Sequence, residues 1–426
     1  MHIARTAHQA QVAPLSPERH PLSPARPIRA VPALAARRCV ALPPPPPRRP
    51  VAAAMASLPP TPAPTSYPGA VHGATLAQFV AAQCVAGPQP GDGPAAPTPA
   101  DTADLLALVG AISTATSDIA ARLASAGIDG LLGAAADAKA AAAAATGASA
   151  SGRDAPKAVD VVANEVFKAA LAATGLVGVL ASEEEEAAVL LPGVAANKYV
   201  AVFDPLDGSS NLPSSLPTGS IWGLYRATGP APDPADALQP GGSLVAAGYA
   251  LYSSATVAVL SLGLGRGAHA FTRDPRTGAW LCTGPGLRLP ARGQTYSLND
   301  ARAGDWPPGL AAYVAAIRAG KGRSGKKYAA RYVCALVADL HRTLAGGVGG
   351  WAANPRPHLR RVYEAAPLAF VTVAAGGAAT DGAGPVLEAV PDALHARAPL
   401  WLGSPDDIEE LLSYGEVRQG VTAYEV

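Results

Sequence analysis

The segment Phe203-Asp204-Pro205-Leu206-Asp207-Gly208-Ser209-Ser210-Asn211 is the part of this chain from which its organisation is most easily deduced. It continues the apolar run Tyr199-Val200-Ala201-Val202-Phe203, which predicts a buried strand. Asp204 and Asp207 stand where this strand ends, and Gly208-Ser209-Ser210 offers backbone N–H groups and hydroxyls suited to an anion. A cation site followed directly by an anion site predicts metal-assisted phosphatase chemistry.

Composition limits the remaining possibilities. The chain has 426 residues, 49% of them apolar, and a formal net charge of +1. This charge gives no general reason to bind nucleic acid or an anionic membrane, and no uninterrupted apolar run approaches the roughly 18 residues that span a bilayer. The four cysteines contain no CxxC pair, which indicates neither a disulfide framework nor a zinc site: Cys39, Cys84, Cys282 and Cys334.

The first 70 residues differ from the rest. They carry eight arginines against a single acid, Glu18, and are rich in proline. This composition predicts an organelle transit peptide, and a disordered basic tail is the alternative. A second low-complexity stretch, residues 133–152, is Ala/Gly/Ser-rich and is expected to form a surface loop leading to Asp154 and Asp160.

Strand and helix patterns alternate through the remainder, which predicts an α/β protein. Helices are expected over residues 75–86, 101–126, 161–171, 328–344 and 364–375 and after Ser404, and strands over 177–181, 199–203, 243–252, 256–262 and 279–282. After the last of these strands the sequence pattern changes from mainly strand-like to mainly helical. We therefore expect a boundary near residue 285 between subdomains 71–285 and 286–426.

Acidic residues follow two successive predicted strands. Glu183 and Glu184 come after the first, and Asp204 and Asp207 after the second. If the strands are neighbours, these acids converge at one sheet edge. Two like charges about 4 Å apart repel by roughly 4 kcal/mol at an effective dielectric near 20, so such a group needs cations or must take up protons. Oxygen ligands favour Mg²⁺ or Mn²⁺. Taken alone, 183–186 is more typical of a solvated acidic run than of a metal site.

These motifs resemble fructose-1,6-bisphosphatase, within the superfamily of lithium-sensitive, magnesium-dependent sugar and inositol phosphatases. Asp-Pro-Leu-Asp-Gly-Ser is shared across that superfamily. The narrower signals are Asn211, Leu244-Val245-Ala246-Ala247-Gly248-Tyr249, Arg331-Tyr332-Val333, Tyr363-Glu364 and Leu402-Gly403-Ser404-Pro405. The resemblance implies a layered α/β/α/β/α fold, a homotetramer, a plastid location and hydrolysis of the 1-phosphate of fructose 1,6-bisphosphate.

The resemblance also assigns residues. It implies that two or three Mg²⁺ or Mn²⁺ ions are bound by Glu183, Glu184, Asp204, Asp207, Glu364 and the Leu206 carbonyl. It implies that Asp160 activates the attacking water, helped by Glu184 and by Asp154 on a closing loop. The resemblance implies that Gly208, Ser209 and Ser210 bind the leaving phosphate. It implies that the second phosphate of the sugar is bound by Asn299, Arg331, Tyr332 and His358.

Some positions depart from the family pattern. Trp351 stands where a tyrosine is usual, His358 where a lysine is usual, and Arg302 replaces a tyrosine. Arg302, Arg356 and Arg360 are therefore candidates to supply the missing charge. Lys198, Tyr199 and Arg226 match part of an AMP site whose phosphate-binding segment is not recognisable, and residues 226–243 lack the cysteine of thioredoxin-regulated relatives.

Two alternatives remain at this stage. One is a phosphatase for another substrate, such as sedoheptulose 1,7-bisphosphate or an inositol phosphate, because the residues expected at the sugar end are altered. The other is a non-catalytic paralogue that binds sugar phosphates or a partner enzyme. Phosphate release from a panel of bisphosphates distinguishes the first alternative from a fructose-1,6-bisphosphatase. Calorimetric binding of a sugar phosphate without hydrolysis would identify the second.

Overall fold

The computed structural model describes residues 67–86, 89, 91–92, 97–132, 158–191, 194 and 197–420. The chain divides into two units, 1–48 and 49–426, and every described residue belongs to the second. Most of the predicted transit peptide and the whole 133–152 loop lie outside the described residues, as does Asp154.

The larger sheet has eight strands in the order β2-β1-β3-β4-β5-β6-β7-β8. Strands β1 and β3 run parallel, and the other neighbours are antiparallel. The strands are β1 (Val177–Ser182), β2 (Val189–Leu190), β3 (Tyr199–Asp207), β4 (Thr218–Arg226), β5 (Leu244–Tyr252), β6 (Thr256–Ser261), β7 (Ala268–Arg273) and β8 (Trp280–Leu287). Every strand expected from the sequence is present.

The smaller sheet has five strands in the order β10-β9-β11-β13-β12. They are β9 (Thr295–Ser297), β10 (Ala329–Ala330), β11 (Trp351–Arg360), β12 (Ala378–Thr380) and β13 (Arg397–Gly403). Strand β11 pairs in parallel with β9 and antiparallel with β13.

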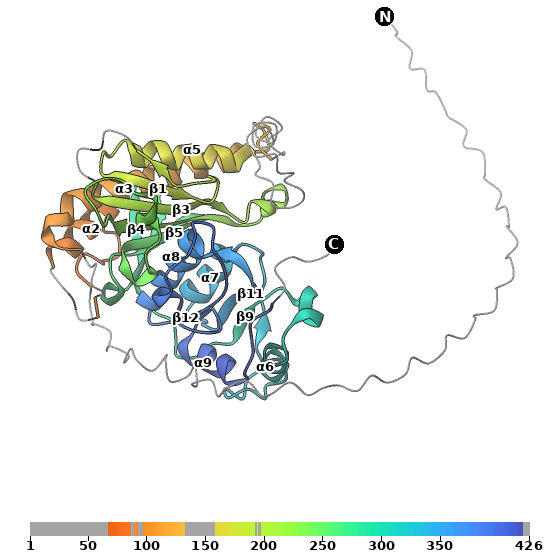
Figure 1. Cartoon of the computed structure of the whole chain (residues 1–426). Coiled ribbons are helices and arrows are strands. Elements are labelled where there is room, and N and C mark those ends of the chain that lie inside the picture. Colours follow the sequence, from red (N-terminus) through yellow and green to blue (C-terminus); the bar gives the residue numbers. More distant parts are fainter. Residues whose placement is uncertain are drawn as a thin grey trace, which may run out of the picture. The chain divides into compact units, whose positions relative to one another are not determined.

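Three sets of helices cover these sheets, as Figure 1 shows. The outer face of the larger sheet carries α2 (Leu76–Val85), α3 (Thr102–Ser125) and α5 (Ala158–Ala172), which share one core with it. Between the sheets lie α7 (Leu336–Ala345) and α8 (Ala366–Ala374). The smaller sheet packs on its other face against α6 (Pro308–Ala319) and α9 (Pro405–Ser413). The predicted α/β/α/β/α layering is confirmed.

Side chains of β3 alternate between two cores, as the period of a strand requires. Ala201 and Phe203 face the outer helices, and Phe203 stacks on Phe167 of α5 at 5.0 Å. Val200 and Val202 face α7 and α8. This alternation directs Asp204, the next residue, to the inner side.

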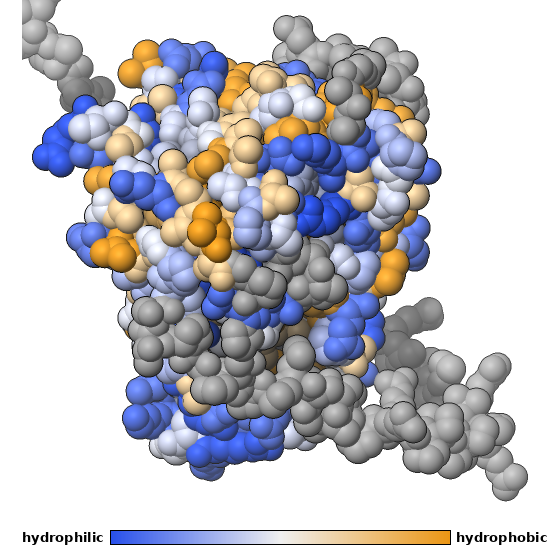
Figure 2. All heavy atoms as spheres, turned by 90° about the vertical axis from the view of Figure 1, so that its left-hand side faces the viewer, coloured by the Kyte–Doolittle hydropathy of each residue, from blue (hydrophilic) through white to orange (hydrophobic). Residues whose placement is uncertain are grey.

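Helix α3, with the short turn before it, is long and apolar enough to cross a bilayer by length and composition. Its apolar residues are nevertheless buried against α2, α5 and the sheet: Leu105, Leu108, Val109, Ile112 and Ile119. It is therefore a core helix. On the molecular face of Figure 2, hydrophobic and hydrophilic residues are interspersed.

The predicted helix over residues 328–344 is wrong in its first half. Ala329 and Ala330 pair with β9, and α7 begins only at Leu336. Cys334 has a φ of 64°, a left-handed conformation that cannot belong to an α-helix. The four-residue spacing of Tyr328 and Tyr332 with the later leucines is therefore coincidental. The helix expected at 364–375 is present, beginning as a π-helical turn, Arg361–Ala365, that runs into α8.

Candidate active site

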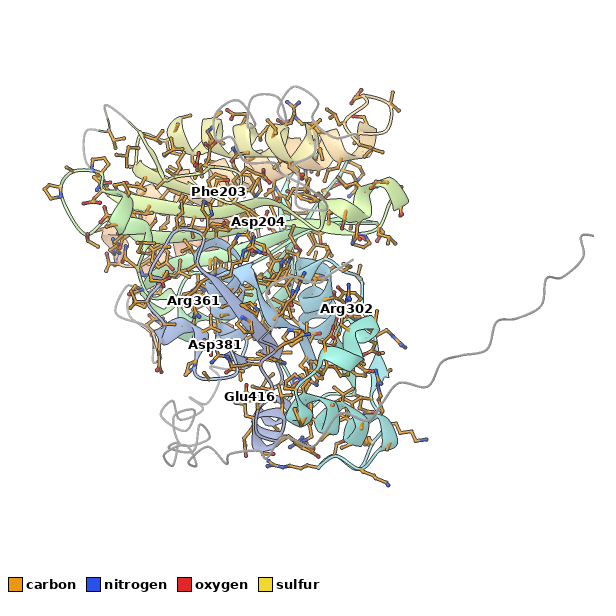
Figure 3. The ribbon with its side chains drawn as sticks, turned by 45° about the vertical axis from the view of Figure 1, so that its right-hand side comes forward. Phe203, Asp204, Arg302, Arg361, Asp381 and Glu416 are labelled. Atoms are coloured by element: carbon orange, nitrogen blue, oxygen red, sulfur yellow. The ribbon has the colours of Figure 1, made fainter. Side chains whose placement is uncertain are left out.

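The predicted convergence of acids occurs. Strand β1 lies parallel to β3, with Ser182 opposite Phe203, so the carboxyl ends of both strands meet at one edge. The Glu183 N–H donates to the Phe203 carbonyl at 3.2 Å, which sets Glu183 beside Asp204. Figure 3 labels Phe203 and Asp204 on this part of the sheet.

Three carboxylates form the centre of the site. One oxygen each of Asp204, Asp207 and Glu364 lie within 4.8 Å of one another. Each group is also fixed by a backbone N–H: Leu206 donates to Asp204 at 2.9 Å, Val337 to Asp207 at 2.8 Å, and Arg360 to Glu364 at 2.6 Å. A carboxylate oriented in this way keeps its other oxygen available.

Electrostatics shows that this cluster is under-compensated. Burial, followed by the charges of Glu183 and Glu364, raises the pKa of Asp204. Burial also raises the pKa of Glu364 and brings the pKa of Asp207 to about 7. Asp207 shows this although it accepts from the first turn of α7, where a negative charge is normally favoured.

One arginine offsets part of this negative charge. The Arg360 guanidinium lies 3.9 Å from Glu183, beside the cluster. It therefore serves the acids and not the sugar pocket for which the sequence made it a candidate. Burial raises the pKa of Glu183, and the charges of Arg360 and Arg397 lower it only in part, so the carboxylates stay under-compensated. Packing of the core does not require these buried carboxylates. Their oxygen atoms are suitable ligands for a hard divalent cation.

Helix α5 brings Asp160 to the same edge, where it lies near Glu184 of the loop after β1. Asp160, Asn164 and Phe167 lie on one helix face at spacings of four and three residues, and the Phe167–Phe203 stack anchors that face to β3. Glu184 is close to Asp160: burial, then repulsion from Asp160 and Glu183, raises the pKa of Glu184 to about 8. These two carboxylates therefore repel each other in the absence of a cation.

The segment after Asp207 turns sharply. Gly208 has a φ of 75°, and a Cβ there would lie 2.5 Å from the Cβ of Ala335, so only glycine fits. The chain then enters a short 3₁₀ helix, Ser209–Ser214. Asn211 ties this helix to the 331–335 segment by donating to the Val333 carbonyl at 3.0 Å. The predicted phosphate-binding role of Gly208, Ser209 and Ser210 stays a prediction.

A small pocket lies on the other side of the 331–335 segment. Two predicted substrate residues line it together with five others: Asn299, Tyr332, Trp306, Ala353, Asn354, Pro355 and Arg356. Arg356, one of the three arginines considered from the sequence, is among these lining residues. Trp306 and Asn354 were missed, because they come from other segments and match no motif.

Other predicted residues of this region lie elsewhere. Arg331 is exposed and donates to the carbonyl of Ala330, and neither it nor His358 is among the pocket-lining residues. Trp351 is fully buried between Tyr296 and Tyr313, with ring centroids 5.4 and 5.9 Å away. Its departure from the family pattern therefore affects the core and not the pocket wall.

The three residues of the suspected AMP site have partners of their own. Arg226 binds Asp101 through two hydrogen bonds of 2.7 and 2.8 Å, and the Tyr199 hydroxyl donates to Asp101 at 3.1 Å. Lys198 pairs with Asp104 at 2.9 Å. The Arg226 guanidinium holds the pKa of Asp101 well below its usual range. Acids at the start of α3 thus neutralise these donors.

A polar network that the sequence did not reveal supports the 183–186 loop. Asn164 donates to Glu185 at 2.7 Å and accepts from Ser182 at 2.7 Å, and the Ser182 hydroxyl accepts from the Glu184 N–H at 3.2 Å. Lys168 pairs with Glu185 at 2.6 Å. The Asn-Glu pair in the α5 sequence was the available signal, but its partners lie some 20 residues away.

Comparison with known proteins agrees with this geometry. Residues 95–285 match the family model "Fructose-1-6-bisphosphatase, N-terminal domain", and residues 289–416 match the model for the C-terminal domain. The chain is 38% identical over 330 residues to the chloroplastic fructose-1,6-bisphosphatase of Brassica napus, covering 73% of this chain and 77% of that one. It is 44% identical over 257 residues to a class 1 enzyme of Sorangium cellulosum, covering 59% and 74%.

A solved structure agrees as well. The Leishmania major fructose-1,6-bisphosphatase in holo form superposes with a TM-score of 0.68 at 33% identity, covering 81% of this chain and 99% of that one. Family models, relatives and fold all indicate one assignment. This chain belongs to the fructose-1,6-bisphosphatase family.

Proposed function

We propose that this chain hydrolyses the 1-phosphate of fructose 1,6-bisphosphate at the carboxylate cluster, releasing fructose 6-phosphate and phosphate. The observation that carries the proposal is the triad of Asp204, Asp207 and Glu364, whose oxygens lie within 4.8 Å of one another with pKa values raised by burial and mutual repulsion. Packing alone does not account for such a group, because its charges destabilise the fold unless a cation binds.

The triad, with Glu183, Glu184 and the Leu206 carbonyl, would hold two or three divalent ions, Mg²⁺ or Mn²⁺. Such ions neutralise phosphoryl charge and acidify bound water. Asp160, buried in the first turn of α5 at the same sheet edge, would take the proton of the attacking water on a carboxylate oxygen. Asp154 would assist from the preceding segment. Gly208, Ser209 and Ser210 would bind the departing phosphate.

The distal pocket would take the other phosphate of the sugar. Asn299, Tyr332 and Arg356 line it, and Arg356 offers a permanent charge. Arg331 and His358 would approach the sugar from the pocket edge. A second candidate substrate, sedoheptulose 1,7-bisphosphate, is favoured by one observation: the pocket wall carries Arg356 and not His358, the residue at the family's lysine position.

The broader assignments are proposals too. We infer a homotetramer in the plastid stroma, with residues 1–70 removed and subdomains meeting near residue 285. Chloroplastic relatives of four plants at 36–38% identity support the location. A cytosolic Brassica relative is 42% identical over 260 residues, so a fluorescent fusion carrying residues 1–70 is the deciding localisation test. Light scattering measures the oligomeric state.

The assay that tests the function measures phosphate release from fructose 1,6-bisphosphate, sedoheptulose 1,7-bisphosphate and an inositol phosphate. We expect turnover of the first, dependent on Mg²⁺ or Mn²⁺, and a loss of about a thousandfold or more in Glu364→Gln. Glu388→Gln, at an exposed glutamate, is the control with unchanged activity. Calorimetric binding of the sugar without any hydrolysis at saturating metal contradicts the proposal and indicates a non-catalytic paralogue.

A further inference from the structure

One imidazole joins the two halves of the carboxylate site. His395, just before β13, has its Nδ1 2.7 Å from the Tyr363 hydroxyl and its Nε2 3.2 Å from the Glu186 carbonyl oxygen. The Tyr363 and His395 rings meet edge to face, 5.9 Å apart. Tyr363 directly precedes Glu364, and Glu186 ends the loop that carries Glu183 and Glu184. His395 therefore contacts both segments without belonging to either.

The partners determine where the protons lie. A carbonyl oxygen only accepts, so the His395 Nε2 must carry the hydrogen that it donates to Glu186. In the neutral imidazole Nδ1 then has a free lone pair, and the Tyr363 hydroxyl donates to it. Tyr363 is fully buried, so its hydroxyl loses a favourable contact if the imidazole is removed. Both ring nitrogens are used.

We propose that His395 is a positioning residue for the metal site: it ties the 183–186 loop to the turn that carries Glu364. The proposal rests on the function proposed above. It extends that function by assigning to His395 the task of keeping ligands from two distant segments at a fixed separation before the metal arrives.

Such a tie is needed because the ligands repel one another. Besides burial, the charges of Glu183 and Glu364 each raise the pKa of Asp204, and the oxygens of Asp204, Asp207 and Glu364 lie within 4.8 Å of one another. Arg360 opposes it through its guanidinium on Glu183 and its N–H on Glu364. His395 acts differently, because it holds the main chain at Glu186 and the side chain next to Glu364. His395 contacts residues next to the proposed ligands and not the ligands themselves. Partners bonded directly to ligands commonly change metal affinity by ten- to a hundredfold, so we expect an effect at the lower end of that range.

The same chain contains a matched control. His341 of α7 lies with its Nδ1 3.0 Å from the Tyr249 hydroxyl, and the rings meet edge to face at 5.8 Å. This second Tyr–His pair joins α7 to β5 and touches none of the proposed ligands. Replacing His341 therefore reports the cost of losing a Tyr–His pair without disturbing the metal site.

The experiment measures Mn²⁺ binding to the full chain by calorimetry, without substrate, together with the thermal midpoint. In His395→Ala we expect a Kd for Mn²⁺ about tenfold higher than in the unmodified chain. His395→Gln keeps an amide donor near the position of Nε2, and we expect its Kd to rise by no more than about threefold. His341→Ala should lower the midpoint and leave the Kd unchanged.

A double-mutant cycle then tests whether both contacts form one chain. Tyr363→Phe removes the hydroxyl, which also has a side-chain hydrogen bond with Arg360, and should raise the Kd by about threefold. In the double variant with His395→Ala the Kd should rise by less than the product of the two single effects, because coupled contacts are not additive. An unchanged Kd in His395→Ala overturns the proposal. If that variant does not fold, an unchanged Kd in Tyr363→Phe overturns it equally. No Mn²⁺ binding by the unmodified chain instead contradicts the proposed function itself.

Discussion

Strand β3 carries a group of charges at each end, and the two groups are built on opposite principles. At its start, Tyr199 and its neighbours Lys198 and Arg226 meet Asp101 and Asp104 in hydrogen bonds and ion pairs. At its end, acids meet acids. The pKa of Asp101 is lowered while that of Asp204 is raised. A group that satisfies itself stabilises the fold, whereas one that leaves charge unbalanced requires a ligand from outside.

The sharpest way to break this contrast is the same substitution at both ends. Asp204→Asn should lower kcat by about three orders of magnitude or more, because it removes a proposed metal ligand from the centre of the cluster. Asp101→Asn should leave kcat within about twofold, because its partners lie at the other end of the strand. Steady-state phosphate release at saturating Mg²⁺ measures both. Equal losses in the two variants would show that the ends are not functionally distinct.

Metal removal should reveal the acid cluster through the pH dependence of stability. The folded pKa values of about 7 for Asp207 and about 8 for Glu184 exceed the ordinary carboxyl values of the unfolded chain. The folded state therefore holds protons that unfolding releases, and stability is largest below about pH 4 for these groups and is lost as pH rises through their folded pKa values.

We accordingly expect the thermal midpoint of the metal-free chain to fall between about pH 5 and about pH 8, with contributions from other groups added. Saturating Mn²⁺ should raise the midpoint more at about pH 8 than at about pH 5, since it competes with fewer protons there. Scanning calorimetry measures both. Asp207→Asn, which cannot titrate at this position, should show a shallower fall, and an unchanged slope in this variant contradicts the assignment.

Substitutions in the charged group at the start of β3, whose members pair with one another, should change the stability of the fold and not the activity. Asp101→Ala removes the acceptor of Arg226 and Tyr199, and we expect it to lower the free energy of unfolding by about 1–2 kcal/mol, a value reduced by the partial exposure of Arg226. Urea unfolding measures this. Because Asp101 engages these donors, millimolar AMP should leave the activity of the unmodified chain unchanged, and clear AMP inhibition contradicts this description of the site.

The smallest effect is expected at the edge of the same group. The Lys198 side chain is 48% exposed in its pair with Asp104, and exposed pairs of this kind contribute little. Lys198→Ala should change the free energy of unfolding by about 0.5 kcal/mol or less in urea. A loss as large as that of Asp101→Ala would mean that Lys198 supports the group far more than its exposure indicates.

Features that depend on the ends of predicted strands could be foreseen from the sequence. The approach of Glu183 to Asp204 was predictable, because both stand near the carboxyl ends of two strands that pair in parallel, although β3 itself continues through Asp204 to Asp207. The layering followed from the family resemblance. The Cys334 turn was not predictable, since cysteine seldom adopts a positive φ and the leucine spacing beyond it suggests a longer helix.

The residues that orient the site were harder to foresee. Asn164 and His395 reach the 183–186 loop from about 20 and 209 residues away, and no short motif records such contacts. The position of Trp351 was recognised as unusual, but the sequence could not show that its ring faces Tyr313 and the core. The side of a strand on which a residue falls depends on its register with neighbouring strands.

The segment 331–337 touches both ends of the proposed substrate site. Its Ala335 presses on Gly208, its Val333 carbonyl receives Asn211, and its Val337 N–H holds Asp207, while Tyr332 lines the distal pocket. With the roles proposed here, this short piece of backbone fixes the distance between the sites for the two phosphate groups of the substrate. Substrates would then be sorted by the span between their phosphates more than by the sugar that joins them.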